Sequence, residues 1–433
     1  MFSSENAYST HVDEVDDSSK EAELLSLRPS KGLKPRKVLI ISSSTGGGHD
    51  MRAKAFKSWT ETEAGRHFGL DVTIHQALET TSQLYRFGVW LYNWIQRVLP
   101  TLHHLYFNFL EFFNPVRRAD RILGGKGFQE IIREIRPDVI ISTHAHLNYG
   151  FFDLAREITG KDCCRYVTYC GELFDTYGFS RHWVNPKVDC FIGAVKETCR
   201  GGNRLGVPEE RSWSGGFLLN PQFYQTPMSQ DEKESFIRDR LRLDPDQFIL
   251  VLATGANGAN NHIRFLNELL AAGLKPQVVA MCGRDHDTFK DVLIWAAEHR
   301  DWTVRALGYY NQIFQLLQCA SCVVARPGTG TTSEAVMAGC PIIFNTVGGI
   351  MPQEMITVEF FRRNFSWPKP VGRTKSLPNR VKRWIQQPQE LLRARRIMES
   401  VQPDSHPIEI LRRIRELADE TEPYEPIRAS GEG

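Results

Sequence analysis

Short runs of apolar residues alternate along this chain with stretches that have the periodicity of helices. In the first half the apolar runs fall at 37–42, 138–142, 165–169 and 189–193. Most of their positions are apolar in succession rather than in alternation, which indicates strands buried on both faces. The pattern therefore predicts a parallel β-sheet with helices packed on either side.

The strand–helix pattern stops near residues 215–230 and then begins again. That stretch contains Gly215 and two Xaa-Pro steps, and a charged run begins after it at Asp231, as is typical of a boundary between domains. Further apolar runs follow at 248–254, 277–282, 302–305, 321–325 and 341–345. The sequence thus predicts an α/β protein with two tandem doubly wound, Rossmann-like domains, 37–219 and 220–374. They should face a cleft at the carboxyl ends of their strands, where open α/β sheets bind ligands.

The two ends of the chain differ from these domains. Residues 1–36 are polar and rich in Ser, without the apolar core of a signal peptide, so we expect a disordered tail. The charged stretch 375–421 is expected to be helical, and 422–433 to be a second tail.

The overall composition limits the kinds of molecule that the protein is expected to bind and the compartment in which it is expected to work. The chain has 53 basic and 51 acidic residues, so its bulk charge predicts no nucleic-acid partner, and any attraction to anions must be local. It has nine cysteines and no Cys-x-x-Cys pair, and Cys190, Cys322 and Cys340 stand in apolar runs. We expect reduced, buried thiols in a cytoplasmic protein.

A glycine-rich loop, Ser42-Ser-Ser-Thr-Gly-Gly-Gly-His49, follows the first predicted strand. Glycines such as Gly47 and Gly48 let the backbone turn sharply and approach a ligand, and the N–H groups of the next helix attract anions. The spacing matches neither the nucleotide-kinase loop nor the dinucleotide fingerprint. A plain tight turn that caps a helix is an open alternative.

A more specific pattern spans residues 325–341. A buried strand ends there, a Pro-Gly turn follows, and a helix opens with several hydroxyl residues, which suits a diphosphate. Glu334, in the first turns, can accept two hydrogen bonds from a ribose, or it can simply suit the helix dipole. Arg326 can donate to the same anion or pair with a carboxylate.

Together these motifs resemble glycosyltransferase family 28. The resemblance rests on 45–49, on 327–335 and on Gly349 followed by Gln353-Glu354, in the same order and spacing over most of 37–365. It is strongest toward monogalactosyldiacylglycerol synthases and bacterial diacylglycerol glucosyltransferases. It implies the GT-B architecture and inverting transfer of a sugar from a UDP-sugar to a lipid hydroxyl, without a metal or other cofactor.

The resemblance also implies roles for single residues. Glu334 would bind the ribose, Tyr309 would lie by the uracil, and Gln353 and Glu354 would meet the sugar hydroxyls. The remaining expected donor-binding residues are Gly47, Gly48, Gly255, Asn257, Gly283, Arg284, Arg326, Gly328, Thr329, Thr331 and Thr332.

Displacement at an anomeric carbon needs a base for the incoming hydroxyl and stabilisation of the departing UDP. His49 is the candidate base, because imidazole titrates near neutral pH and a helix start lowers its pKa. His49 could instead orient the acceptor or cap the helix, and Glu172 and Asp175 are reserve bases. The helix that begins near Thr331 can stabilise the UDP.

A lipid acceptor requires contact with a bilayer, and residues 84–113 are dense in aromatics. Phe87, Trp90 and Trp94 share one helical face, and Arg117 and Arg118 follow the segment. Charged and polar residues interrupt it, so it is not a spanning helix. Its composition favours an interfacial helix on anionic lipid, although an ordinary core helix has the same periodicity. We expect a peripheral protein on the inner face of the membrane.

Two acidic pairs, Asp244/Asp246 and Asp285/Asp287, imitate a metal site, but turn chemistry explains both. We predict no metal. Two other functions remain open on this architecture. One is a UDP-sugar 2-epimerase, and the other is a non-catalytic relative that binds nucleotide or membrane.

Overall fold

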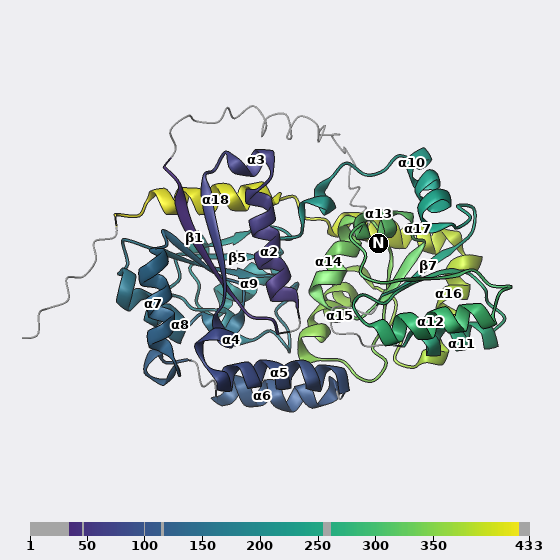
Figure 1. Cartoon of the computed structure of the whole chain (residues 1–433), viewed down its shortest axis with the longest axis horizontal. Coiled ribbons are helices and arrows are strands. Elements are labelled where there is room, and N and C mark those ends of the chain that lie inside the picture. Colours follow the sequence, from purple (N-terminus) through teal and green to yellow (C-terminus); the bar gives the residue numbers. More distant parts are fainter. Residues whose placement is uncertain (1–33, 46, 99, 114–116, 254–260, 424–433) are drawn as a thin grey trace, which may run out of the picture.

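Two parallel β-sheets, one from each half of the chain, organise the protein (Figure 1). The computed structural model describes residues 34–423, apart from 46, 99, 114–116 and 254–260. Every pair of neighbouring strands is parallel in both sheets. The predicted α/β class with two doubly wound domains is confirmed.

The first sheet has the strand order β2-β1-β3-β4-β5-β6. Its strands are β1 (Arg36–Ser42), β2 (Leu70–Gln76), β3 (Val139–Ser142), β4 (Arg165–Cys170), β5 (Cys190–Gly193) and β6 (Ser212–Ser214). Successive side chains of a strand point to opposite faces, and both faces of β1 are covered. Val38 packs in one cluster with Phe56, and Leu39 packs in another with Phe128. This double burial is the reason for the continuous apolar run.

The second sheet has the order β11-β10-β7-β8-β9. Its strands are β7 (Ile249–Ala253), β8 (Gln277–Met281), β9 (Val304–Leu307), β10 (Cys322–Ala325) and β11 (Ile342–Phe344). The central strands β7 and β10 are almost fully buried. The carboxyl end of β10 leads directly into the helix that carries the predicted diphosphate motif.

Helices cover both sheets. In the first half they are α2 (Gly48–Thr60), α3 (Glu63–Arg66), α4 (Ala77–Thr81), α5 (Gln83–Val98), α6 (His103–Phe113), α7 (Gly125–Ile135), α8 (Gly150–Thr159) and α9 (Lys196–Arg204). In the second half they are α10 (Gln230–Ser235), α11 (His262–Ala271), α12 (His286–Glu298), α13 (Ile313–Cys319), α14 (Thr329–Met337) and α15 (Pro352–Phe365).

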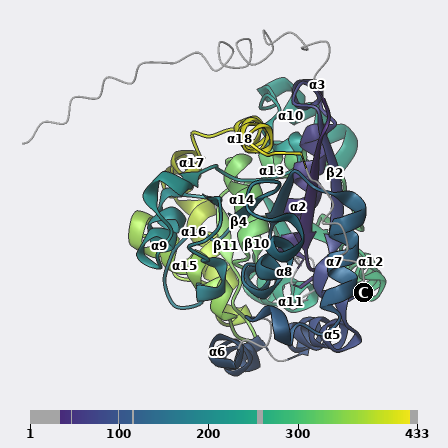
Figure 2. The ribbon, with the colours of Figure 1, turned by 90° about the vertical axis from the view of Figure 1, so that its left-hand side faces the viewer.

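The C-terminal helical stretch is divided between the two domains. The helices α16 (Leu377–Gln386) and α17 (Pro388–Val401) pack on the second domain, whereas α18 (Pro407–Asp419) returns to the first (Figures 1 and 2). Leu411 and Ile414 are buried there in the core of the first sheet, and Asp419 accepts a 2.9 Å hydrogen bond from Arg36. The last helix thus ties the end of the chain to its first strand.

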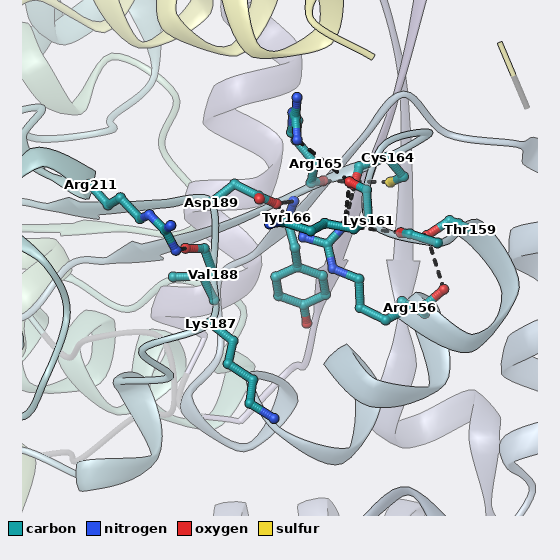
Figure 3. Close-up of polar contacts among 12 residues, drawn as sticks. Arg156, Thr159, Lys161, Cys164, Arg165, Tyr166, Lys187, Val188, Asp189 and Arg211 are labelled. Carbon is teal, nitrogen blue, oxygen red and sulfur yellow. Dashed lines mark hydrogen bonds and ion pairs between the residues drawn. The ribbon is translucent and has the colours of Figure 1, made fainter. Parts of the chain in front are cut away.

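A partly buried ion pair lies at the amino ends of β4 and β5 in the first sheet (Figure 3). Arg156, at the end of α8, pairs with Asp189, which immediately precedes β5. The same carboxylate accepts a 2.6 Å bond from the backbone N–H of Tyr166, and the guanidinium also donates to the carbonyls of Gly160 and Cys164. Charge and hydrogen bonds are matched, so this cluster serves the fold.

The cysteines agree with the sequence analysis. All nine are free thiols, and all but Cys163 are buried. None of the helices in the described part of the chain has the length and hydrophobicity that crossing a bilayer requires.

Candidate functional site

The first glycine loop lies between the end of β1 and the start of α2. Gly47 has a positive φ of 76°, which glycine adopts without strain, and Gly48 is the first residue of the helix. The loop is held by Glu79 of α4, whose carboxylate accepts a 3.1 Å bond from Ser43 Oγ and a 2.6 Å bond from the Ser44 N–H. The sequence analysis missed Glu79, because nothing in its local pattern links it to the loop.

His49 lies at the start of α2 with its ring half-buried. Its Nδ1 is 2.7 Å from the carbonyl oxygen of Thr143. A carbonyl only accepts, so Nδ1 carries the proton and Nε2 keeps its lone pair. Burial, and to a smaller extent the charge of Arg52, lower the pKa of His49 to about 3. The imidazole is therefore neutral, with one nitrogen able to accept a proton.

Other histidines lie near His49. The ring of His144 packs edge-on against it at 4.5 Å between centroids. The backbone N–H of His146 donates to His144 Nδ1, so His144 Nε2 must donate to Thr45 Oγ1, 2.9 Å away. Burial lowers the pKa of His144, His146 and His182, so these three imidazole rings are neutral. Their separation in the sequence hid this cluster from the sequence analysis.

The second predicted motif forms the start of α14. Gly328 precedes the helix and Thr329 opens it. The hydroxyl of Thr332 is fully buried and has no hydrogen-bond partner among the described residues. Glu334 is half-buried, and burial raises the pKa of its carboxyl to about 7. The start of α14 therefore carries a hydroxyl and a carboxyl that burial leaves without full solvation.

The two helix starts lie against each other across the boundary between the domains. Arg52 of α2 donates from Nη2 to Thr329 Oγ1 of α14 at 2.6 Å. A Cβ atom added to Gly330 would lie 2.8 Å from the end of the Met51 side chain, so glycine permits this approach. His49, one turn before Arg52, thus belongs to the same region as the predicted diphosphate motif.

Two predicted donor residues bind each other. Arg326 forms a buried, two-pronged ion pair with Glu354 at the start of α15, with Nε 2.9 Å from one carboxylate oxygen. Glu354 also accepts from the N–H of Met351. Each charge neutralises the other, which corresponds to the carboxylate-partner alternative for Arg326. The donor roles predicted for the two side chains would require them to exchange this pair for a ligand.

Other predicted donor residues occupy varied positions. Thr331 is half-buried near the start of α14. Tyr309, after β9, is 74% exposed, and the Arg284 guanidinium lies over its ring at 5.3 Å. Gly283, beside Arg284, has a φ of 57°. Gly255 and Asn257 lie outside the described residues.

Glu172 and Asp175 differ as reserve bases. Glu172 is buried, and burial raises the pKa of its carboxyl to about 7, opposed by the charge of Arg52. Asp175 pairs with Arg204 of α9, so its charge is already matched. Turn chemistry accounts for one member of each acidic pair. Asp244 accepts from the N–H of residue 246, and Asp285 caps α12 by accepting from the N–H of residue 288.

The aromatic face of α5 is exposed. Phe87, Trp90 and Trp94 are 54%, 56% and 46% exposed, and their rings stack in sequence along the helix. The exposed side chains of α6 add Leu105, Phe109 and Phe112. A core helix would bury this face, so that alternative is wrong for α5. Of the basic residues that follow, Arg117 lies over the Tyr149 ring and Arg118 pairs with Asp120.

The opposite side of the α5–α6 hairpin contacts the second domain near the start of α15 (Figures 1 and 2). His104 Nε2 is 2.8 Å from the carbonyl oxygen of Ile350. Gln353, predicted to meet the sugar, donates to the Tyr92 hydroxyl at 3.4 Å, and its own carbonyl oxygen has no described partner. The hairpin thus joins an exposed apolar surface to the predicted sugar site.

The chain is similar in sequence to lipid glycosyltransferases. No protein-family model matches it. It is 23% identical to the processive diacylglycerol beta-glucosyltransferase of Bacillus pumilus, over 75% of this chain and 81% of that protein. It is 24% identical to the chloroplastic monogalactosyldiacylglycerol synthase of Spinacia oleracea, over 79% of this chain and 66% of that protein. The resemblance predicted from the motifs is confirmed.

Solved structures of glycosyltransferases share the fold. MurG of Acinetobacter baumannii superposes with a TM-score of 0.54 at 13% identity, covering 89% of this chain and all of that one. A UDP-glucosyltransferase of Polygonum tinctorium superposes with a TM-score of 0.55 at 14% identity, covering 90% and 99%. At such identities the likeness concerns the fold alone. The protein has the predicted GT-B architecture.

Proposed function

We propose that this protein is an inverting glycosyltransferase that moves a hexose from a UDP-sugar to the hydroxyl of a membrane lipid such as diacylglycerol. The observation that carries the proposal is the contact between the two helix starts, where Arg52 of α2 reaches Thr329 of α14. It brings the helix of His49 beside the predicted diphosphate motif. The similarity to lipid glycosyltransferases supports the same activity.

His49 is the proposed base. Its Nδ1–H is held by the Thr143 carbonyl, so Nε2 takes the proton of the acceptor hydroxyl as the acceptor oxygen bonds to the anomeric carbon. The free enzyme holds the pKa of His49 at about 3, which keeps the base form but weakens it. A bound diphosphate brings negative charge, which raises that pKa toward the range in which a general base works best.

The start of α14 is proposed to hold the leaving UDP. Its free N–H groups and the hydroxyls of Thr331 and Thr332 suit the diphosphate, and Glu334 suits the two ribose hydroxyls. Backbone dipoles at the start of the helix supply part of the positive charge that the departing phosphate needs. We therefore propose a reaction without a metal ion, in which chelation with EDTA leaves turnover unchanged.

We propose that the exposed face of α5 and α6 rests on the inner face of the membrane. The stacked rings of Phe87, Trp90 and Trp94 supply apolar contact, and Arg117 and Arg118 supply attraction to anionic headgroups. Sedimentation with anionic phosphatidylglycerol vesicles tests this. The double variant Trp90→Ser/Trp94→Ser should bind at least tenfold more weakly, since each large side chain is worth about 1.5 kcal/mol or more on burial.

A control variant keeps that test specific. Leu293→Ser changes a side chain that is 48% exposed on α12 of the second domain, and should bind vesicles as the unmodified protein does. Equal binding by the Trp90→Ser/Trp94→Ser protein would contradict the proposed membrane face.

A donor-by-acceptor screen tests the activity itself. The purified protein is incubated with several UDP-hexoses and a lipid extract, and products are identified by mass spectrometry. We expect a glycolipid of inverted anomeric configuration. Epimerised UDP-sugar without glycolipid would favour the epimerase alternative, and nucleotide binding without any product would favour a non-catalytic relative.

A further inference from the structure

Arg52 is a buried guanidinium at the meeting point of the two domains. It lies on α2 three residues after His49, so the two side chains share one face of the helix. The residue is 5% exposed. Its Nη2 donates to the carbonyl of Gly171 at 3.0 Å and to Thr329 Oγ1 at 2.6 Å. Both acceptors are neutral.

The charge of Arg52 is not matched by an ion pair among the described residues. By comparison, Arg326, which follows β10, and Arg204 of α9 each pair with a carboxylate. Glu172 is near enough for the charge to affect its pKa, but it does not reach ion-pair distance. Burying an unpaired charge is costly, so the position is best explained if an anion joins it during function.

The surrounding backbone is shaped to admit this guanidinium. A Cβ atom at Gly171 would lie 2.1 Å from Arg52 Cζ, so only a residue without a side chain lets the group lie across the strand end. In α14, the buried hydroxyl of Thr332 has no hydrogen-bond partner among the described residues. The start of α14 thus receives the Arg52 guanidinium from the other domain, and the same helix carries a Thr332 hydroxyl without a described partner.

We propose that Arg52 binds the diphosphate of the nucleotide donor and stabilises it as it leaves, an inference that rests on the proposed function. When the bond between the anomeric carbon and the β-phosphate oxygen breaks, its electron pair stays on that oxygen. The acceptor oxygen forms the new bond to carbon, and its proton goes to His49. Arg52 then supplies a fixed positive charge beside the oxygen that becomes negative.

The binding of UDP and of uridine to the purified full-length protein, measured by calorimetry, tests this role. Arg52→Gln should weaken UDP binding about 10- to 100-fold, as expected when a charge-assisted hydrogen bond is lost, and leave uridine binding unchanged. Arg52→Lys should restore part of the UDP affinity. Lys54→Gln, an exposed change on the same helix, serves as the matched control.

The outcomes separate the two proposals. If the unmodified protein does not bind UDP, the donor assignment fails. If it binds UDP and Arg52→Gln binds UDP equally well, the donor site stands and the role of Arg52 is overturned. An equal loss of uridine and UDP affinity, with no rescue by Arg52→Lys, would mean that Arg52 only holds the domains together, which also overturns it. Thermal unfolding of each variant checks that it is folded.

Discussion

Two arginines, one at each end of the strands of the first sheet, have opposite surroundings: Arg52 is buried, and Arg156 is partly buried. Arg156, at the amino ends of β4 and β5, pairs with Asp189 and donates to backbone carbonyls (Figure 3). Arg52, beside the carboxyl ends, has two neutral acceptors and no ion pair in the part of the chain that the structure describes. Both residues are arginines on helices that pack against the same sheet.

The difference separates stability from function. At the amino ends of β4 and β5, the charges of Arg156 and Asp189 neutralise each other, as expected where a protein has only to remain folded. At the carboxyl ends of the strands in the two sheets, Arg52 has no ion pair and the Thr332 hydroxyl no hydrogen bond among the described residues, and burial raises the pKa of Glu334. Open α/β sheets bind ligands at the carboxyl ends of their strands. Groups that bind a ligand there keep unmatched charge or hydrogen-bonding capacity until the ligand arrives.

The largest effect is expected when the ion pair between Arg156 and Asp189 is broken. Asp189→Ala leaves the partly buried Arg156 guanidinium without its carboxylate and removes the acceptor of the Tyr166 N–H. We expect the free energy of unfolding to fall by about 3 kcal/mol or more, measured by urea denaturation. UDP affinity per folded molecule should not change. A loss of UDP affinity without loss of stability would contradict the comparison.

An effect of nearly equal size is expected at the carboxyl ends of the strands, where it lowers turnover rather than stability. His49→Ala removes the proposed base and should lower turnover about 100-fold or more, as measured by glycolipid formation at saturating donor. The midpoint of thermal unfolding should stay close to that of the unmodified protein, as it should in Lys54→Gln. Near-normal turnover in His49→Ala would leave His49 with an orienting or capping role.

A smaller effect is expected from pH. Burial raises the pKa of Glu334 to about 7, so its carboxyl is mainly protonated at pH 6 and mainly ionised at pH 8. Only the ionised form accepts hydrogen bonds from both ribose hydroxyls. The affinity for uridine, which carries no phosphate to titrate, should therefore rise about tenfold between these pH values. Calorimetry on Glu334→Gln should show weaker binding that does not change over the same range.

Much of the fold could be predicted because the signals for it are local. Continuous apolar runs such as 37–42 and 321–325 identified strands covered on both faces, and the lapse near 215–230 separated the two sheets. The loops that follow β1 and β10 were recognised from glycines and hydroxyl residues. Each of these patterns depends on the backbone preferences of neighbouring residues.

Periodicity left the position of two elements undecided. The aromatic face of α5 has the pattern of a core helix, and only packing shows that Phe87 and Trp90 face outward. The stretch 375–421 looked uniform, yet α18 crosses back to the first sheet. An amphipathic pattern states that one face is apolar, but it does not state what that face contacts.

By itself, then, the sequence determined two parallel sheets, two helix starts suited to anions and a histidine at one of them. Tertiary structure decided how charges are shared among residues far apart in the chain. It paired Arg326 with Glu354 and brought Arg52 to Thr329 without giving it a carboxylate. The physical reason is distance along the chain. Backbone preference acts over a few residues, whereas an ion pair depends on which surfaces meet when the two domains pack.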